Sequence, residues 1–441
     1  KAIRRQRQIC IRDSRYITTR IVEMLARLRT MGASTLPVQG MYEKAVSYLH
    51  TQWLDEYRQM KENEKKGNKN GLPGEQYLHY LYICALDEQV AKRTDKTAYL
   101  YMTDRLEAGA PSDAIYDRAL IATILHKAGK KVKADELARS ILEYSVATPE
   151  MGRYFDTSKA RYSWGSYRIP TQVVAIEALS GILKEPLAIA EMKQWLLKQK
   201  QMQVWDNPVA TADAVFALLM KGANLLDNQG DVRIVIANEV LETVSPSKTT
   251  VPGLGYIKRS FTQKNVVDAR KIEVEKRNPG IAWGAVYAEF ESPVSDVKQQ
   301  GGELNVEKQL YVERTMNNVP QLQPITAKTV LQVGDKVVSR LSIRVDRPMD
   351  FVQLKDQRGA CFEPIGSISG YRWNNGLGYY VDIKDASANF FFDHLGKGVY
   401  VLEYSYRVSR AGTYETGLAT MQCAYAPEYA SHSASMTIII K

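Results

Sequence analysis

Residues 171–179 read TQVVAIEAL and residues 211–219 read TADAVFALL, and the two stretches share a spacing of small residues. Alanines occupy positions i and i+3 in each stretch, as Ala175 and Ala178 do in the first. Small residues at this spacing lie on one helical face and let two helices approach closely. We therefore expect both helices to line the inner side of a ring of helix hairpins. Ordinary packing within a helical bundle is the alternative that the spacing leaves open.

The rest of the first half of the chain also has the pattern of helix hairpins. Apolar residues recur at helical spacing, as at Ile17, Ile21 and Leu25, and Gly129 marks a short turn between two such segments. A row of hairpins is stable because each one buries its apolar face on its neighbours. The pattern predicts about nine helices, at 17–28, 41–61, 75–86, 98–106, 115–128, 137–144, 171–183, 187–200 and 210–225.

The pattern changes near Asp227, and after Gly230 apolar and polar residues alternate. Alternation with a period of two is typical of β-strands. Four strands are expected first, at 232–236, 255–261, 271–275 and 282–290, followed by a linker at 294–304. A second block begins at residue 306, with strands expected at 337–345, 351–354, 379–383, 388–392, 398–408 and 436–440. Many short strands at such spacing favour an antiparallel β-sandwich.

The composition is that of a globular chain of about three domains. Of the 441 residues, 45% are hydrophobic and 24% are charged, and no apolar run reaches the roughly 18 to 20 residues that span a bilayer. The net charge of +10 is spread along the chain, and the densest basic stretch, 61–69 (KENEKKGNK), contains no aromatic residue. We therefore expect no nucleic-acid partner. The chain starts with Lys and has no signal-peptide pattern, which predicts a mature form or a fragment.

The four cysteines and five histidines are scattered, and no CxxC motif occurs. Structural zinc sites need clustered pairs of ligands, so we expect no metal site. Cys361 and Cys423 fall in strand-like sequence, and they are a candidate disulfide across strands of one sheet if the compartment is oxidising. The spacing of the residues does not decide whether this bridge forms.

A ring of helix hairpins can hold a glycosidase, which needs two carboxylates facing each other across a cleft. Acidic residues near helix starts are also explained by the helix dipole, and none of them lies in a distinctive motif. The candidates are Asp87, Glu88, Asp156, Glu177, Asp206 and Asp213. An aromatic loop at 151–167, with Tyr154, Tyr162, Trp164 and Tyr167, suits either a sugar platform or a cap on the helical domain. Nucleophile-elbow, P-loop, dinucleotide and HExxH motifs are absent from the sequence.

Three segments resemble bacterial α-2-macroglobulin-like proteins. They are 13–20 (DSRYITTR), then 195–205 (WLLKQKQMQVW) continuing to 211–219, and finally the run from 398–404 (GVYVLEY) through 411–414 (AGTY) to 425–432 (YAPEYASH). The order of these segments carries the resemblance, which covers essentially the whole chain. It implies an α+β multidomain fold. An α/α toroid of thioester type would occupy 1–228, a CUB-like β segment 229–296, and a C-terminal macroglobulin-like β-sandwich 297–441.

The resemblance also implies where a thioester would form. Members of the family that carry a thioester have a Cys-x-Glu-Gln motif, in which the cysteine sulfur bonds the glutamine carbonyl. Neither Cys10, followed by Ile-Arg-Asp, nor Cys84, followed by Ala-Leu-Asp, fits this motif. About nine helices are also fewer than the twelve of a complete ring of six hairpins. We therefore expect the ring to be incomplete at its N-terminus, with its first helices upstream, where a thioester motif could also lie.

The function implied by the resemblance is that of a non-catalytic part of a protease-trapping inhibitor. Its partners would be proteases, met through the full-length parent protein, and no cofactor is implied. The parent would lie in the periplasm or cell envelope, with membrane contact only through a lipid anchor outside this chain. The alternatives are a carbohydrate-active or carbohydrate-binding toroid with accessory β domains, and a plain adhesion or scaffold protein.

Overall fold

The computed structural model describes residues 14–441 with internal gaps. The gaps are residues 69–73, 111, 157–166, 204, 206, 221–231, 237–238, 243–249, 252–255, 258–259, 261–270, 278–285, 287–291, 367 and 375. The chain forms two compact units, residues 1–198 with 205–283 and residues 199–204 with 284–441. The division into three domains at residues 228 and 296 stays a prediction.

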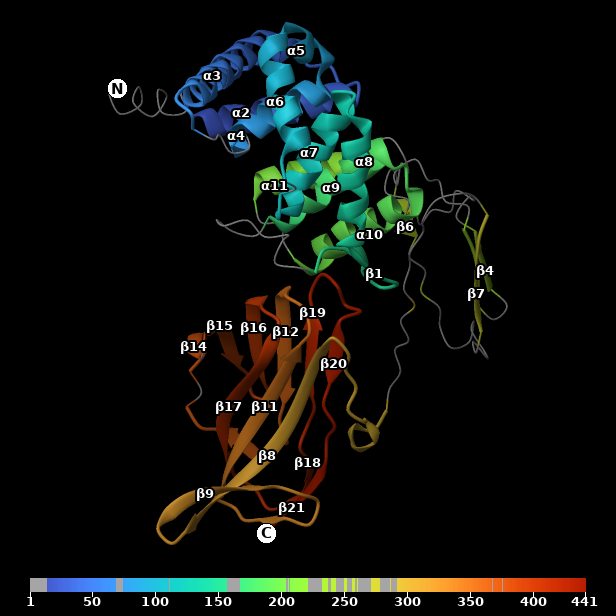
Figure 1. The fold of residues 1–441 in the computed structure, drawn as a ribbon. Coiled ribbons are helices and arrows are strands. Elements are labelled where there is room, and N and C mark those ends of the chain that lie inside the picture. Colours follow the sequence, from blue (N-terminus) through green and yellow to red (C-terminus); the bar gives the residue numbers. More distant parts are fainter. Residues whose placement is uncertain are drawn as a thin grey trace. The chain divides into compact units, whose positions relative to one another are not determined.

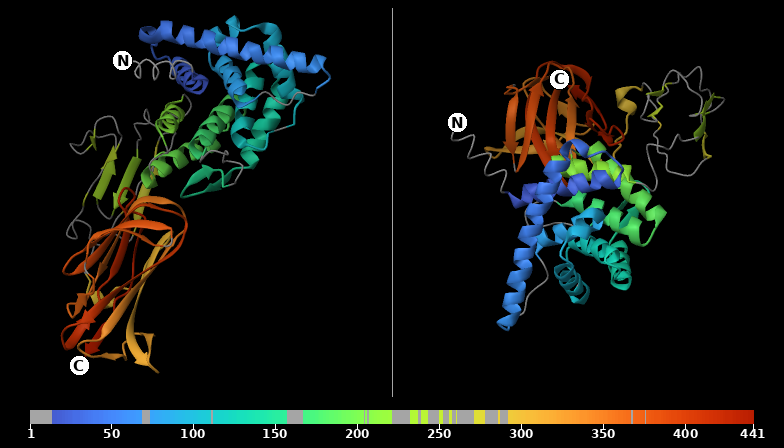
Figure 2. Two further views of the ribbon diagram at one scale, coloured as in Figure 1. Left: turned by 90° about the vertical axis from the view of Figure 1, so that its left-hand side faces the viewer. Right: turned by 90° about the horizontal axis from the view of Figure 1, so that it is seen from above.

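The first unit is built mainly of α-helices joined by short connections (Figure 1). All nine predicted helices are present among the described residues, and the short α5 is an additional one. Their bounds are α2 (Arg15–Thr30), α3 (Gln39–Lys65), α4 (Glu75–Leu86), α5 (Glu88–Arg93), α6 (Lys96–Ala108), α7 (Ile115–Lys127), α8 (Lys131–Glu143), α9 (Arg168–Ile182), α10 (Pro186–Met202) and α11 (Pro208–Leu219). Both views in Figure 2 show α3, with its 27 residues, along its length. No helix in the described part of the chain is long and apolar enough to cross a membrane.

Five of these helices contact one another in a closed cycle. The cycle runs from α2 to α4, α7, α9 and α11, and α11 returns to α2. Helix α8 packs outside the cycle against α7 and α9. Ala175 and Ala178 on α9 are buried, as are Ala214 and Ala217 on α11, and the two helices contact each other. The small residues are therefore buried on two helices that contact each other, and their place on the inner side of the ring stays a prediction. The predicted missing hairpins concern chain beyond the described residues and stay a prediction.

Local signals in the sequence set the ends of these helices. The Ser14 hydroxyl accepts a hydrogen bond from the backbone N–H of Ile17, which caps α2, and Asn207 caps α11 in the same way. Gly129 follows α7 with a φ of +84°, a left-handed conformation that favours glycine. This turn reverses the chain within a few residues, so α7 and α8 form an antiparallel hairpin.

The chain after α11 contains two small antiparallel sheets. One has the strand order β4-β3-β7, with β4 (Glu239–Glu242), β3 (Val232–Ile236) and β7 (Ile272–Lys276), and the other pairs β5 (Thr250–Val251) with β6 (Tyr256–Ile257). The predicted strands at 232–236 and 271–275 are confirmed, and β6 is the described part of the one at 255–261. The fourth, at 282–290, lies outside the described residues apart from Val286.

The second unit is a β-sandwich. One sheet has the order β13-β17-β11-β8-β9, and the other has the order β14-β15-β16-β12-β19-β20. A third, short sheet has the order β10-β21-β18. The bounds are β8 (Leu304–Met316), β9 (Val319–Pro324), β10 (Val330–Leu331), β11 (Lys336–Val345), β12 (Met349–Gln357), β13 (Phe362–Pro364), β14 (Gly370–Asn374), β15 (Leu377–Ile383), β16 (Ser387–Leu395), β17 (Gly398–Val408), β18 (Gly412–Glu415), β19 (Ala419–Cys423), β20 (Ala430–His432) and β21 (Thr437–Ile440).

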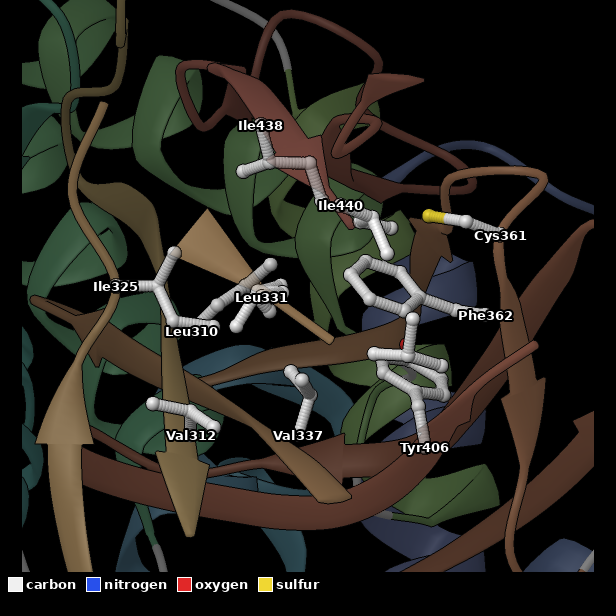
Figure 3. Packing of buried hydrophobic residues seen from close by; sticks show 11 residues of the cluster. Leu310, Val312, Ile325, Leu331, Val337, Cys361, Phe362, Tyr406, Ile438 and Ile440 are labelled. Atoms are coloured by element: carbon white, nitrogen blue, oxygen red, sulfur yellow. The ribbon is translucent and has the colours of Figure 1, made fainter. Parts of the chain in front are cut away.

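An apolar cluster fills one part of the sandwich (Figure 3). Side chains from both long strands and short ones meet there, including Leu310 on β8, Val337 on β11, Phe362 on β13 and Ile438 on β21. The ring of Phe362 stacks on that of Tyr406, with centroids 5.4 Å apart. Short strands are therefore held in the fold by the same core as the long ones. The helical toroid and the antiparallel β domains confirm the predicted fold class.

A buried ion pair joins the two large sheets. Lys308 on β8 places its Nζ 2.8 Å from Oδ1 of Asp356 on β12, and both side chains are almost fully buried. The same ammonium group donates to the backbone carbonyl oxygens of Gln357 and Thr416, at 2.6 and 3.0 Å. Ser339 and Tyr404 donate to the other carboxylate oxygen of Asp356. This pair is therefore well hydrogen-bonded, which is the condition for burying two charges.

Candidate functional site

Charged and polar side chains from all five ring helices meet inside the helical unit. We call this group the ring cluster. Its members are buried, with Arg20 at the edge, and they come from α2 (Arg20, Glu23 and Arg27), α4 (His79 and Tyr82), α7 (Tyr116), α9 (Glu177) and α11 (Asp213). A paired-carboxylate active site is the alternative that such a ring leaves open, so the geometry of the cluster decides what its acidic groups can do.

Arg27 occupies the centre of the ring cluster. Its Nη1 donates to Oδ1 of Asp213 at 2.5 Å, and its Nη2 donates to Oε2 of Glu177 at 3.0 Å. The same Nη2 lies 3.1 Å from the hydroxyl oxygen of Tyr82, which itself donates to Glu177. The guanidinium also lies over the ring of Phe216, 5.1 Å from its centroid. One side chain of α2 therefore connects α4, α9 and α11.

Glu23 extends the cluster toward α4 and α7. Its Oε2 accepts from Nη1 of Arg20 at 3.3 Å and lies 3.0 Å from Nδ1 of His79. Arg20 also donates to the hydroxyl of Tyr116 at 3.2 Å, and that hydroxyl lies 3.4 Å from Nε2 of His79. Glu23 thus has partners on its own helix and on α4, and Arg20 and His79 extend the network to Tyr116 on α7.

The carboxyl groups of the cluster differ in their pKa. Burial raises the pKa of Glu177 and of Asp213 above the ordinary values, against the opposing effect of Arg27. Burial would also raise the pKa of Glu23, but the charges of His79 and Arg27 outweigh it and lower that pKa well below its usual range. Glu23 therefore stays ionised to lower pH than an exposed glutamate does, whereas Glu177 and Asp213 take up a proton at higher pH than exposed carboxyl groups do.

The structure brings together two of the predicted carboxylates and separates the others. Glu177 and Asp213 both bind Arg27, and their side chains are only 6% and 10% exposed. Asp87 caps α5, accepts from the hydroxyl of Tyr42 at 2.8 Å and pairs with Arg29 at 3.2 Å. Glu88 and Asp156 are exposed, and Asp206 lies outside the described residues. Glu177 and Asp213 are thus neighbours around a cation and have little access to solvent.

Arg27, Glu23 and His79 are members of the cluster that the sequence did not single out. Glu23 and Arg27 are four residues apart in α2, so they share the face that carries the buried Val22 and Ala26. A charged pair on an apolar helical face is a signal of a buried ion network, because charges are rarely buried without partners. The pattern gives no partner outside α2, however, and the members on the other helices lie 50 or more positions away.

The aromatic loop is only partly described. Tyr154 stacks on Trp195 of α10, with ring centroids 6.2 Å apart and planes at 12°. Tyr167 meets the edge of Tyr116, with centroids 5.4 Å apart. Tyr162 and Trp164 lie outside the described residues. Tyr154 and Tyr167 therefore have their rings against other aromatic rings of the helical unit.

The three described cysteines are buried free thiols. Cys84 on α4 lies 3.4 Å from the hydroxyl of Thr94, and burial raises the pKa of its thiol to about 12. Cys361 precedes β13 in the five-stranded sheet, whereas Cys423 ends β19 in the six-stranded sheet, so the two do not lie in one sheet as the sequence pattern suggested. Their pairing stays a prediction, which mass spectrometry of the denatured, alkylated protein with and without a reductant tests. Cys10 lies outside the described residues.

No group of three or more histidine, cysteine, aspartate or glutamate side chains among the described residues is placed to hold a metal ion. The ring cluster itself contains two guanidinium groups beside its three carboxyl groups. A cation there would compete with Arg27 for the same oxygen atoms. The arrangement therefore supports ion pairing within the protein, as in a structural network.

The sandwich matches a known domain. Residues 304–428 match the family model described as the bacterial alpha-2-macroglobulin MG10 domain. This range begins at the first residue of β8 and ends between β19 and β20, so it contains most of both large sheets. No curated protein matches the chain.

Several solved structures are similar to the chain over 97% of its length. Escherichia coli alpha-2-macroglobulin activated by porcine elastase is 12% identical, with a TM-score of 0.43, and the chain covers 36% of it. The trypsin-activated E. coli protein has the same identity and TM-score, with 27% of it covered. A Salmonella alpha-2-macroglobulin mutant is 12% identical, with a TM-score of 0.31 and 26% covered. The chain thus spans about a quarter to a third of these proteins. Residues 304–428 of the chain are thus similar to the MG10 domain of bacterial alpha-2-macroglobulins.

Proposed function

We propose that this chain is the C-terminal part of a protease-trapping inhibitor of the bacterial cell envelope, in which it has no catalytic role. The MG10 match at residues 304–428 supports this proposal. In such a trap a protease cuts a bait region elsewhere in the parent protein, and the cut releases a conformational change that encloses the protease.

We propose that the helical unit moves as a rigid body. The observation that carries this proposal is the pairing of Arg27 with both Glu177 and Asp213. These carboxylates, the best candidates for a glycosidase pair, are buried and bound to an internal cation. Their chemistry supports the cohesion of five helices, because breaking the network would leave charges buried without partners.

The proposed trap forms no thioester from the cysteines of this chain. Cys84 is followed by Ala85, Leu86 and Asp87, and its thiol is buried against Thr94. Burial also keeps this thiol protonated, which supports a packing role. Cys10 is followed by Ile-Arg-Asp, which does not fit the thioester motif either.

Partners and location follow from the same proposal. The partners are proteases, which meet the chain through the parent protein, and no cofactor takes part. The parent is proposed to lie in the periplasm and to carry its lipid anchor outside residues 1–441. Within the chain, the toroid is proposed at 1–228, the CUB-like segment at 229–296 and the sandwich at 297–441.

The test uses the full-length parent protein and trypsin. After incubation, residual trypsin activity is measured on a small peptide substrate and on a large protein substrate. A trap is expected to remove activity on the large substrate alone, because enclosure excludes it sterically, and to become more compact on cleavage. Equal activity on both substrates, with no change of shape, would contradict the proposal.

A second measurement tests the thioester separately. Methylamine opens a thioester by attacking its carbonyl carbon, so a thioester-bearing peptide gains mass. We expect no peptide from residues 1–441 to gain mass when the parent is treated with methylamine. A mass gain within these residues would contradict the thioester-free part of the proposal and leave the trap itself standing.

A further inference from the structure

The sandwich contains a cavity of about 460 Å³ at one end of its strands. It lies where β12 ends, beside the turn between β15 and β16 and beside β18. Charged and polar side chains lie on its wall, among them Lys355, Arg358, Thr413 and Glu415. Its volume falls within the range of small-ligand pockets in proteins. This cavity belongs to the sandwich and shares no residue with the ring cluster.

Arg358 is the buried cation of this cavity. The residue is only 8% exposed, and its Nη2 donates to the backbone carbonyl of Lys384. The backbone N–H of Arg358 donates to the carbonyl oxygen of Ala386 at 3.1 Å, which fixes the position of the backbone from which the side chain extends. The Nε and Nη1 atoms are buried and have no hydrogen-bond partner among the described residues. A buried charged donor without a partner is costly, so a ligand that supplies acceptors there gains affinity.

Two carboxylates lie near Arg358, one close in the sequence and one in the wall of the cavity. Both already have other partners. Asp356, two residues before Arg358, pairs with Lys308 at 2.8 Å and accepts from Ser339 at 3.1 Å. Glu415 accepts from the hydroxyl of Thr437 at 2.6 Å and from that of Ser435 at 3.3 Å. Neither carboxylate forms an ion pair with Arg358 among the described residues. These two carboxylates therefore leave Nε and Nη1 of Arg358 without an acceptor among the described residues.

We propose that this cavity binds the carboxylate of an acidic peptide segment, with Arg358 as the residue that pairs with it. A guanidinium forms strong charge-assisted hydrogen bonds with a carboxylate. The wall carries two cationic groups, Lys355 and Arg358, and one anionic group, Glu415, so its formal charge is +1. That charge matches a singly charged carboxylate better than doubly charged phosphate. The proposal rests on the sandwich alone and is independent of protease trapping.

The test follows the side-chain Nε–H signals of the whole chain labelled with ¹⁵N-arginine, by NMR. The probe is the blocked tripeptide acetyl-Ala-Glu-Ala-amide, and its Gln counterpart is the matched control ligand. The signal of Arg358 is identified as the one missing from Arg358→Lys. Arg340→Lys, which changes an exposed arginine on β11, is the matched control variant. We expect the Glu peptide to shift the Arg358 signal in a saturable way, and the Gln peptide to bind at least tenfold more weakly.

A second variant tests the proposal without removing the arginine. Glu415→Gln keeps a hydrogen-bond acceptor for Thr437 and removes the negative charge from the wall. We expect it to tighten binding of the Glu peptide about twofold to threefold, since a like charge is lost at a partly exposed position. An Arg358 signal that does not move, or moves equally with both peptides, would overturn the proposal. Tighter binding of inorganic phosphate than of the Glu peptide would overturn its assignment to a carboxylate.

Discussion

Nη1 of Arg27 on α2 lies 2.5 Å from Oδ1 of Asp213 on α11, although the two residues are 186 positions apart in the chain. This hydrogen bond joins the first and the last described helices of the ring. Glu177 of α9 binds the neighbouring nitrogen of the same guanidinium. The ring is therefore closed by an ion network as well as by apolar packing, and Arg27 is the residue on which that closure depends.

Replacing Arg27 by methionine should destabilise the helical unit strongly. Arg27→Met keeps much of the side-chain volume but leaves Glu177 and Asp213 buried without their cation. Breaking a buried pair in this way typically costs about 3–5 kcal/mol. Urea unfolding followed by circular dichroism measures the loss. Arg58→Met is the matched control, since Arg58 is exposed and pairs with Asp55 in the same helix, and it should cost about 0.5 kcal/mol or less.

The reason for the Arg27 effect can be tested in the same background. Adding Glu177→Gln and Asp213→Asn to Arg27→Met removes the unpaired charges, so the triple variant should recover part of the lost free energy of unfolding. If Arg27→Met and Arg58→Met cost the same, the ring does not depend on the cluster. If the triple variant is less stable than Arg27→Met alone, the loss comes from packing and not from unpaired charge.

The sequence predicts the ring well because helical spacing is a local property. The alanines of α9 and α11 predict close packing of both helices without any knowledge of their neighbours. The ring cluster is different, because its contacts between helices join residues 37 to 186 positions apart. Glu177 and Asp213 could be selected as acidic residues of the helical half, although both lie inside their helices and not in a first turn. Their common partner, Arg27, depends on the closure of the ring, which no local pattern contains.

The sequence also did not predict several short elements, nor the bounds of the 13-residue strand β8. Helix α5 has six residues, and β13 and β20 have three each, so they are too short for a periodic pattern. They exist because neighbours hold them. β13 pairs with the long strand β17, and Phe362 within it stacks on Tyr406. Long strands such as β11 and β17 were predicted nearly to their ends, because their alternation extends over ten or eleven residues.

Glu56 on α3 should make stability depend on pH. Burial raises the pKa of its carboxyl group from 4.5 to about 7, against the smaller effects of Tyr77 and Arg15. The folded protein therefore binds a proton that the unfolded chain has released. This contribution to stability is fully present below pH 4.5, falls as the pH rises, and is lost above about pH 7.

The variant Glu56→Gln isolates this contribution. Its free energy of unfolding relative to wild type should increase between pH 4.5 and about 7 and then level off. The measurement is urea unfolding at several pH values within that window. Gln59→Ala, on the same helix and without a titratable group, checks that the pH dependence of all other groups cancels. A difference between Glu56→Gln and wild type that stays constant across the window would contradict the prediction.

The ion pair between Lys308 and Asp356 should be essential to the sandwich. Lys308→Met leaves Asp356, which is fully buried, without its cation. We expect a loss of about 3–5 kcal/mol, measured by urea unfolding of the β unit. Lys336→Met is the control, because Lys336 pairs with Glu313 at a partly exposed position, and it should cost about 1 kcal/mol or less. Adding Asp356→Leu to Lys308→Met should restore part of the lost free energy of unfolding. A further loss in the double variant would show that the carboxylate stabilises the sandwich in another way.

Cys84 should resist alkylation in the folded protein. Its thiol is buried on α4 beside Thr94, and its pKa is raised from 9 to about 12. The thiolate is the reactive form, so at pH 8 this shift lowers its fraction by about a thousandfold. Iodoacetamide labelling at that pH, read by peptide mass spectrometry, should therefore be slow in native protein and fast in urea. Ser47→Cys introduces a thiol at an exposed position of α3 and is the matched control. Because the control thiol tests the reagent in the same sample, equal rates at both sites in native protein would show that Cys84 is an accessible nucleophile, and the packing role proposed for it would be wrong.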